Sequence, residues 1–143
     1  MRAFLLVAAA AVSLSACMMS SNQQARTERN EAAAVLSADG QSYGDGARLT
    51  GAPQSCVPLT AIRNSRVLSN RVIDFGNGHR WSYRVVLPQD CPNLGFEQRF
   101  TYSTSLSQLC ATDIITVLQS PGISRGASCG LAPFQPIELP PRG

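Results

Sequence analysis

Lysine is absent from this chain of 143 residues, and all 12 of its basic residues are arginines. With nine acidic residues the formal net charge is +3. The arginines are spread along the sequence, whereas a nucleic-acid-binding protein gathers an excess of positive charge in one region. We therefore expect no nucleic acid partner. Arginine is nevertheless suited to planar, bidentate contacts with carboxylate or phosphate groups.

Histidine occurs only once, as His79, beside an expected turn at Asn77-Gly78. A Ser-His-Asp triad needs a histidine base, and a solvated residue beside a turn is the simpler interpretation of His79. The sequence also lacks the G-x-S-x-G, P-loop and HExxH motifs. We therefore expect a protein that is not an enzyme and that has no cofactor.

A small hydrolase that uses scattered carboxylates is the remaining enzymatic alternative. Glycoside hydrolysis needs two carboxyl groups that flank the same bond, and the sequence leaves open whether any two converge. Asp113 precedes an expected strand, where an aspartate commonly accepts hydrogen bonds from backbone N–H groups of a turn. The carboxylates of the expected domain are Asp74, Asp90, Glu97, Asp113 and Glu138.

No apolar run is long enough to cross a membrane as a helix, which takes about 20 residues. The most apolar stretch, Ala3 to Leu14, follows Arg2 and leads into the small residues Ser15-Ala16. A positive charge, a short apolar run and a small-residue exit are the three parts of a secretory signal. Residues 1–16 are therefore predicted to be a signal peptide.

The next residue completes a second motif, because Leu14-Ser15-Ala16-Cys17 resembles the bacterial lipobox. The resemblance implies that the Cys17 thiol carries a diglyceride, that the chain is cut before this residue, and that the lipid anchors the protein in a membrane. Ordinary secretory cleavage at the same bond is the alternative, but it requires a small residue three positions before the cut, where Leu14 stands. Met18 replaces the aspartate that retains enteric lipoproteins in the inner membrane. We therefore expect a bacterial cell-envelope protein, in the outer membrane facing the periplasm rather than in the inner membrane.

Four further cysteines, an even number, predict two disulfides in a small exported domain. They are Cys56, Cys91, Cys110 and Cys129. A metal site is not expected, because no two of them have C-x₂₋₄-C spacing and His79 is remote from all four. Three pairings are possible. We favour Cys56–Cys91 with Cys110–Cys129, since each then joins neighbouring segments.

Composition divides the exported chain into a tether and a domain. Residues 17–55, beginning with the lipidated Cys17, are rich in Ser, Asn, Gln, Ala and Gly and have few large apolar residues, a composition that cannot offset the entropy of ordering. We expect a flexible tether there, with a transient helix over 25–36. Residues 56–139 form the expected domain, and residues 140–143 form a tail.

The local signals in the domain are mainly those of β-strands. Clear alternation over 80–87 predicts a half-buried strand, and turn residues at Ser69-Asn70 and 76–78 predict hairpins on either side of 71–75. The loop 119–128 is expected to be irregular. The six expected strands lie at 66–68, 71–75, 80–87, 94–102, 114–118 and 134–139, with a helical turn as the alternative at 105–110. The predicted fold is all-β: a small, disulfide-stapled antiparallel barrel or sandwich.

The cysteines and the residues beside them resemble a family of uncharacterised small secreted proteobacterial proteins. The resemblance covers most of residues 56–139. It implies a compact disulfide-bonded fold and contributes no mechanism. The stretches that carry it are Cys56-Val57-Pro58, Val67 to Ile73, Cys91-Pro92-Asn93-Leu94, Cys110 to Ile115 and Ser128 to Phe134.

Two sets of side chains could bind a partner. Arginines on the outward face of the first hairpins are a candidate patch for an anionic envelope component or an acidic protein, although a merely solvated face is the alternative. Aromatic residues could line a cleft, but a small domain needs most of them in its core. The candidate patch is Arg63, Arg66, Arg71, Arg80 and Arg84, and the aromatic set is Trp81, Tyr83, Phe96, Phe100 and Tyr102.

These observations together favour a cell-envelope lipoprotein that acts as a non-enzymatic binding or accessory module. Its expected partners are the membrane, through the N-terminal lipid, and an envelope protein or an anionic envelope component. A lysozyme-inhibitor-like module is the main alternative, because such inhibitors are also small exported β proteins. A protruding loop without a pocket would favour the inhibitor, and carboxylates gathered in one pocket would favour the hydrolase.

Overall fold

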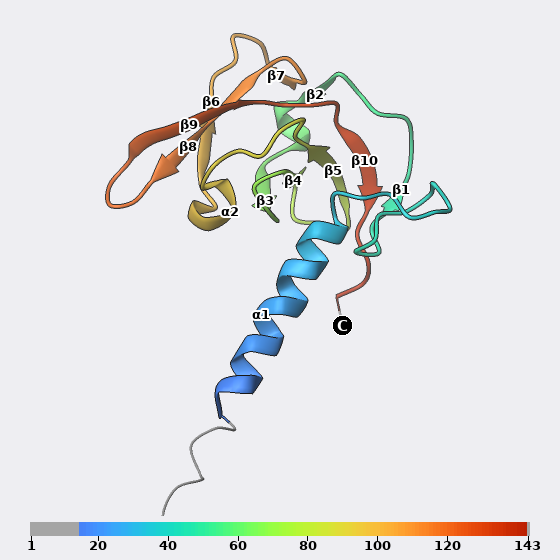
Figure 1. The fold of residues 1–143 in the computed structure, drawn as a ribbon. Helices are drawn as coiled ribbons and strands as arrows, with labels where there is room; N and C mark the ends of the chain where they lie inside the picture. Colours follow the sequence, from blue (N-terminus) through green and yellow to red (C-terminus); the bar gives the residue numbers. More distant parts are fainter. Residues whose placement is uncertain (1–14, 143) are drawn as a thin grey trace, which may run out of the picture.

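The computed structural model describes residues 15–142. The predicted signal peptide up to Leu14, and Gly143, lie outside these residues. The first described element is helix α1, Ser15–Ala32, which extends away from the rest of the protein (Figure 1). Residues 21–29 of this helix are all exposed, as expected of a helix that is polar on every side. Between residues 15 and 142 no helix has the length and apolarity to span a bilayer.

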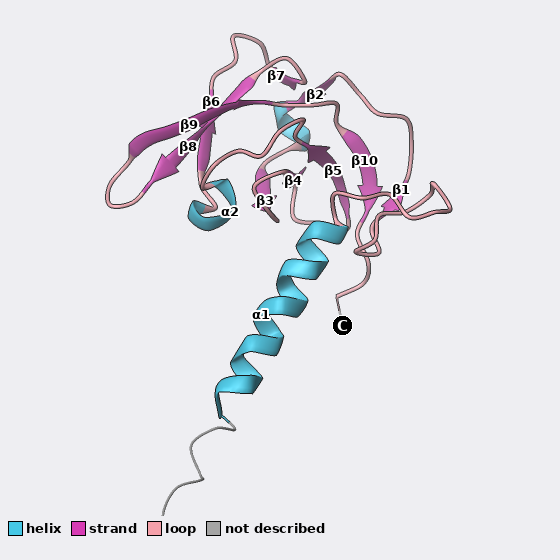
Figure 2. Ribbon diagram, in the orientation of Figure 1, coloured by secondary structure: helices cyan, strands magenta, loops and turns pink. Residues whose placement is uncertain are grey.

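The larger sheet consists of five antiparallel strands (Figure 2). In spatial order they are β1 (Arg48–Leu49), β10 (Gln135–Glu138), β5 (Trp81–Val86), β4 (Val72–Gly76) and β3 (Asn64–Val67). Both predicted hairpins are confirmed. In the first, the Leu68 N–H donates to the Val72 carbonyl over 2.9 Å. In the second, Gly78 has a φ of +90°, which favours glycine.

Two smaller antiparallel sheets complete the domain. The first contains β6 (Phe100–Tyr102), β8 (Ile114–Gln119) and β9 (Ser124–Gly130), with β8 in the middle, and the second pairs β2 (Cys56–Pro58) with β7 (Gln108–Cys110). A 3₁₀ turn η1 (Leu59–Ala61) and a one-turn helix α2 (Leu94–Glu97) lie between strands. The all-β, antiparallel fold class is therefore confirmed.

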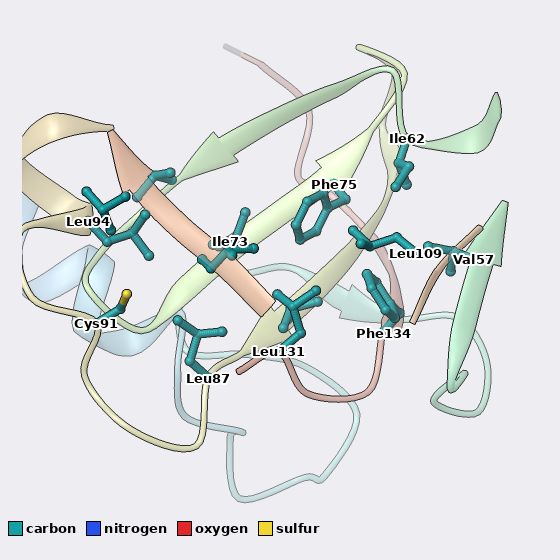
Figure 3. Close-up of a cluster of buried hydrophobic side chains, with 14 residues drawn as sticks. Val57, Ile62, Ile73, Phe75, Leu87, Cys91, Leu94, Leu109, Leu131 and Phe134 are labelled. Carbon is teal, nitrogen blue, oxygen red and sulfur yellow. The ribbon is translucent and has the colours of Figure 1, made fainter. Parts of the chain in front are cut away.

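Side chains from all three sheets meet in one buried core (Figure 3). The ring of Phe75 packs edge-to-face with the rings of Phe100 and Phe134, with centroid separations of 5.9 and 5.7 Å. The prediction that the aromatic set fills the core is right for Tyr83, Phe100 and Tyr102, which pack against it. It is wrong for Trp81 and Phe96, which are 60% and 84% exposed. Trp81 stands at the start of β5, and Phe96 lies on the short helix α2 outside the sheets.

The strand predictions were incomplete in three places. Residues 94–97 form α2, so only 100–102 of the predicted strand 94–102 is extended. The expected loop 119–128 is largely strand, because β9 pairs with β8 although its sequence SRGASCG has no β-branched residue. The segment 105–110 ends in β7 and not in a helical turn. Long-range pairing overrides weak local propensity in each strand that was missed.

The predicted boundary at Cys56 was also wrong, because residues 33–49 belong to the folded domain. Tyr43 and Ala47 are buried against Ile137 on the face of the larger sheet that lies opposite the main core. The chain turns sharply beneath α1, where a Cβ on Gly44 would lie 3.0 Å from the Cβ of Ala32. The small residues of this segment give it the composition of a tether. Their small size also lets the segment pack closely against the sheet.

The two disulfides are confirmed, but the favoured pairing was wrong. Cys56 is bonded to Cys110 and Cys91 to Cys129. The first bond joins β2 to β7, whose register places Cys56 directly opposite Cys110. The second joins the loop before α2 to β9. Each bridge connects segments that are distant in sequence, whereas the prediction had assumed that sequence neighbours would be joined.

Candidate functional site

The predicted arginine patch does not form one surface, because Arg84 is completely buried. Its side chain lies on the face of β5 opposite Val85, and there the segment 33–47 covers it. Period-two alternation correctly placed Arg84 opposite the core face. It could not reveal that both faces of this strand are covered. The prediction of Arg84 as an exposed binding residue is therefore wrong.

Arg84 is the centre of a buried ionic cluster. Its Nε and Nη2 donate to the two carboxylate oxygens of Asp74 over 2.8 and 3.0 Å. Its Nη1 and Nη2 each donate to an oxygen of Asp45 over 2.9 Å. Nη1 also donates to the Ala33 carbonyl over 3.3 Å, and the guanidinium carbon lies 4.7 Å from the ring centroid of Tyr43. One side chain thus fastens the segment 33–45 to the sheet.

The charges of this cluster stabilise one another. Burial would raise the pKa of Asp45, but the hydrogen bonds and the charge of Arg84 outweigh it and hold that pKa below its ordinary value. Burial would likewise lower the pKa of Arg84, and Asp74 and Asp45 instead raise it above its ordinary value. Burial also raises the pKa of Tyr43. Arg84 therefore remains charged and committed to its two carboxylates, which is a structural role.

The other predicted arginines are exposed but lie in different surroundings. Arg66 reaches Asp74 over 3.3 Å from the solvent side. Arg71 donates to the Leu87 carbonyl, and Arg80 pairs with Glu138 over 2.6 Å. Of these residues only Arg66 faces a hollow that is lined by other arginines.

That hollow lies between α1, β3 and α2 and has a volume of about 460 Å³. Arg26 and Arg29 line it from α1, and Arg66 lines it from β3. We call the site of these three residues the arginine groove. Sequence analysis missed Arg26 and Arg29, although their spacing of three in a helix-forming stretch predicts a shared face. What the sequence could not show is that Arg66 lies across from that face.

A neighbouring hollow offers a useful contrast. It has a volume of about 530 Å³, shares Asn30 and Gly95 with the arginine groove, and is lined among others by Glu31, Arg71 and Asp90. Two carboxylates and one guanidinium give it no excess of positive charge. The arginine groove contains three guanidiniums and one carboxylate, that of Asp45, which already accepts hydrogen bonds from Arg84. Of these two neighbouring hollows only the arginine groove therefore has an excess of positive charge.

The carboxylates proposed for a hydrolase occupy separate places. Asp74 is held by Arg84, and Glu138 pairs with Arg80. Asp113 accepts a hydrogen bond from the Cys110 N–H over 2.7 Å, as predicted for a turn. Glu97 accepts one from the Ser120 N–H over 3.2 Å, and Asp90 is exposed beside Arg71.

His79 is exposed and borders a different cavity from the arginine groove. This is the solvated position beside a turn that the sequence predicted. Within residues 15–142 no three His, Cys, Asp or Glu side chains gather in a way that could hold a metal ion.

The β8–β9 hairpin protrudes from one end of the molecule (Figure 1). Residues 120–125 at its tip are all exposed, and Ile123 is 78% exposed. The base of the tip is fixed, because Ser120 accepts a hydrogen bond from Arg99 over 2.5 Å and donates its N–H to Glu97. The hairpin therefore presents an apolar side chain on a supported loop.

Comparison of the chain with models of protein families, with curated proteins and with solved structures finds no match.

Proposed function

We propose that this protein is a lipid-anchored component of the bacterial cell envelope, whose β domain binds another envelope component and catalyses no reaction itself. The observation that carries the proposal is helix α1. It begins at the lipobox, is exposed over residues 21–29, and leads directly into a disulfide-bonded domain. A polar helix in this position suits a spacer between a lipid and a binding domain.

The dimensions of α1 fit that role. A helix rises about 1.5 Å per residue, so the part that follows Cys17 extends about 20–25 Å. Such a spacer would hold the domain beyond the lipid headgroups. The two disulfides support an oxidising compartment such as the periplasm, and the outer membrane is the location we propose.

The positions of the carboxylates and of His79 favour binding over catalysis. The described carboxylates of the domain are separately paired or exposed, and His79 lies apart from the arginine groove. General acid–base chemistry needs such groups to converge on one substrate. Among the described residues, two surfaces are the candidates for binding: the arginine groove and the β8–β9 hairpin.

A lysozyme-inhibitor-like module is the second candidate, and the β8–β9 hairpin is the observation that favours it. A supported loop with one apolar side chain at its tip suits insertion into the cleft of a partner protein, since pre-organised loops lose little entropy on binding. A lysozyme activity assay with the purified protein tests this candidate: dose-dependent inhibition supports it, and unchanged activity counts against it.

Mild cross-linking and affinity capture of the tagged protein from detergent-solubilised envelopes tests binding in general. We expect one stoichiometric protein partner for an accessory or inhibitory module. If the hairpin makes the contact, Ile123→Asp should lower capture about tenfold, as expected for the loss of one buried apolar side chain. Leu106→Asp, at a residue that is 59% exposed on another loop, is the matched control and should leave capture unchanged.

Capture without any enriched protein contradicts the protein-binding form of the proposal. It would move the search to anionic glycans or lipids, for which the arginine groove is the candidate site. Equal losses of partner capture for the Ile123 and Leu106 variants would exclude the hairpin tip as the specific contact.

A further inference from the structure

We propose that the arginine groove binds the dianionic phosphate group of a phosphate monoester or of inorganic phosphate, through Arg26, Arg29 and Arg66. This inference deepens the proposed function, on which it rests, by naming the chemical class of an anionic ligand.

The groove contains positive charge that the protein itself does not neutralise. Arg66 shares the Asp74 carboxylate with Arg84 and is the more distant partner, at 3.3 Å against 2.8 Å for the Arg84 Nε. In the described part of the chain Arg26 and Arg29 form no ion pair with any carboxylate. Asp45, the acidic residue that borders the groove, has both oxygens bonded to Arg84 and one of them also to the Ala47 N–H. A bound anion would supply the negative charge that the groove lacks.

The number of guanidiniums points to phosphate over carboxylate. In the buried cluster both oxygens of Asp74 accept hydrogen bonds from Arg84, and the second arginine, Arg66, is held only at 3.3 Å. A single carboxylate ligand has two oxygens, which suit one bidentate arginine. A phosphate monoester carries a charge between about −1.5 and −2 at pH 7 and three strong acceptor oxygens. It can therefore bond to guanidiniums that approach from α1 and from β3 together.

Uncharged donors add to the same site. Asn30 and Gln98 line the groove with side-chain amides, and an amide N–H₂ can donate to a phosphate oxygen.

The position of the groove allows two sources for the phosphate. Arg26 and Arg29 follow Cys17 by nine and twelve residues, which is about 14–18 Å along a helix. That height suits a phosphate on the extended headgroup of a membrane glycolipid, and it equally suits a soluble phosphate in the surrounding compartment. The chemistry recognised is the same in both cases.

Calorimetric titration of the full-length protein in uncharged detergent tests the proposal. One arm uses inorganic phosphate, and the other uses micelles doped with monophosphoryl lipid A, a glycolipid that carries a phosphate monoester on its sugar headgroup. Acetate at the same ionic strength is the carboxylate comparison. We expect saturable binding in at least one phosphate arm and at least tenfold weaker binding of acetate. Binding of inorganic phosphate identifies a soluble source as sufficient, and binding of the doped micelles alone identifies a lipid headgroup.

The decisive variant is the pair Arg26→Gln and Arg29→Gln. Each lost hydrogen bond to a charged group lowers affinity roughly tenfold or more, so the pair should weaken phosphate binding by at least about that factor. The matched control is Arg63→Gln with Arg125→Gln, which removes the same charge from exposed residues that do not line the groove. The control should change affinity by less than about twofold, because exposed charges away from the site are screened. All four residues are exposed, so circular dichroism melts should match the wild type.

The proposal is overturned if neither phosphate probe binds, if acetate binds as tightly as phosphate, or if the two variant pairs lose affinity equally. These outcomes are distinguishable from failure of the proposed function. The groove can fail to bind phosphate while the protein still captures a partner from the envelope, and phosphate can bind although Cys17 carries no lipid.

Discussion

Replacing Arg84 with methionine is expected to lower the free energy of unfolding by about 3–5 kcal/mol, the usual cost of removing one partner from a buried ion pair. The guanidinium has no exposed surface, and the side chains of Asp45 and Asp74 are only 10% and 3% exposed. Without Arg84 the Asp45 carboxylate would stay buried without its cationic partner, and Asp74 would keep only the more distant Arg66. Urea denaturation at neutral pH measures the loss.

Two further variants separate this effect from a simple loss of positive charge. Arg80→Gln removes a guanidinium that is 57% exposed and pairs with Glu138, and exposed ion pairs contribute at most about 1 kcal/mol. The triple variant Arg84→Met, Asp45→Asn, Asp74→Asn should regain a large part of the lost stability, since no uncompensated charge remains. A loss under about 1 kcal/mol for Arg84→Met would contradict the structural role of the cluster.

Removing either disulfide is expected to lower the free energy of unfolding about as much as replacing Arg84. The bridges close loops with sequence separations of 54 and 38 residues, for which the chain-entropy model gives about 4 kcal/mol each at 25 °C. We expect each double variant to lower the free energy of unfolding by about this amount. The two variants are Cys56→Ala with Cys110→Ala and Cys91→Ala with Cys129→Ala. Urea denaturation of each double variant against the wild type checks it.

The second pair is expected to be the more damaging. Cys91 is completely buried in the main core, so its replacement removes packed atoms as well as the covalent bond. Cys56 and Cys110 are both only half-buried. Peptide mapping under non-reducing conditions provides the control. Peptides that join Cys56 to Cys91 would contradict the connectivity of the structure.

Local patterns in the sequence were enough to predict the fold class. Alternation over 80–87 and the turn residues before and after 71–75 predicted the central hairpins, because period two and turn chemistry are properties of short segments. The even cysteine count predicted two disulfides. Strands such as β9 were missed because small residues have no strong local preference, and pairing with β8 determines their conformation.

The arrangement around Arg84 depends on contacts that no local pattern encodes. Asp45 and Arg84 are 39 positions apart in the chain, and the segment that contains Asp45 resembles a tether in composition. The burial of Arg84 and its hydrogen bonds to two carboxylates are incompatible with its predicted place in an exposed binding patch. Arg26 and Arg66 likewise share a groove only because α1 ends beside β3.

The proposed anchoring through Cys17 is tested most directly by mass spectrometry of the protein purified from the membrane fraction. We expect a chain that begins at Cys17 and carries the added mass of a diglyceride on its thiol, with Cys17→Ser found in the soluble fraction. A membrane-derived chain that retains residues 1–16, or that has a free thiol at Cys17, would contradict the account.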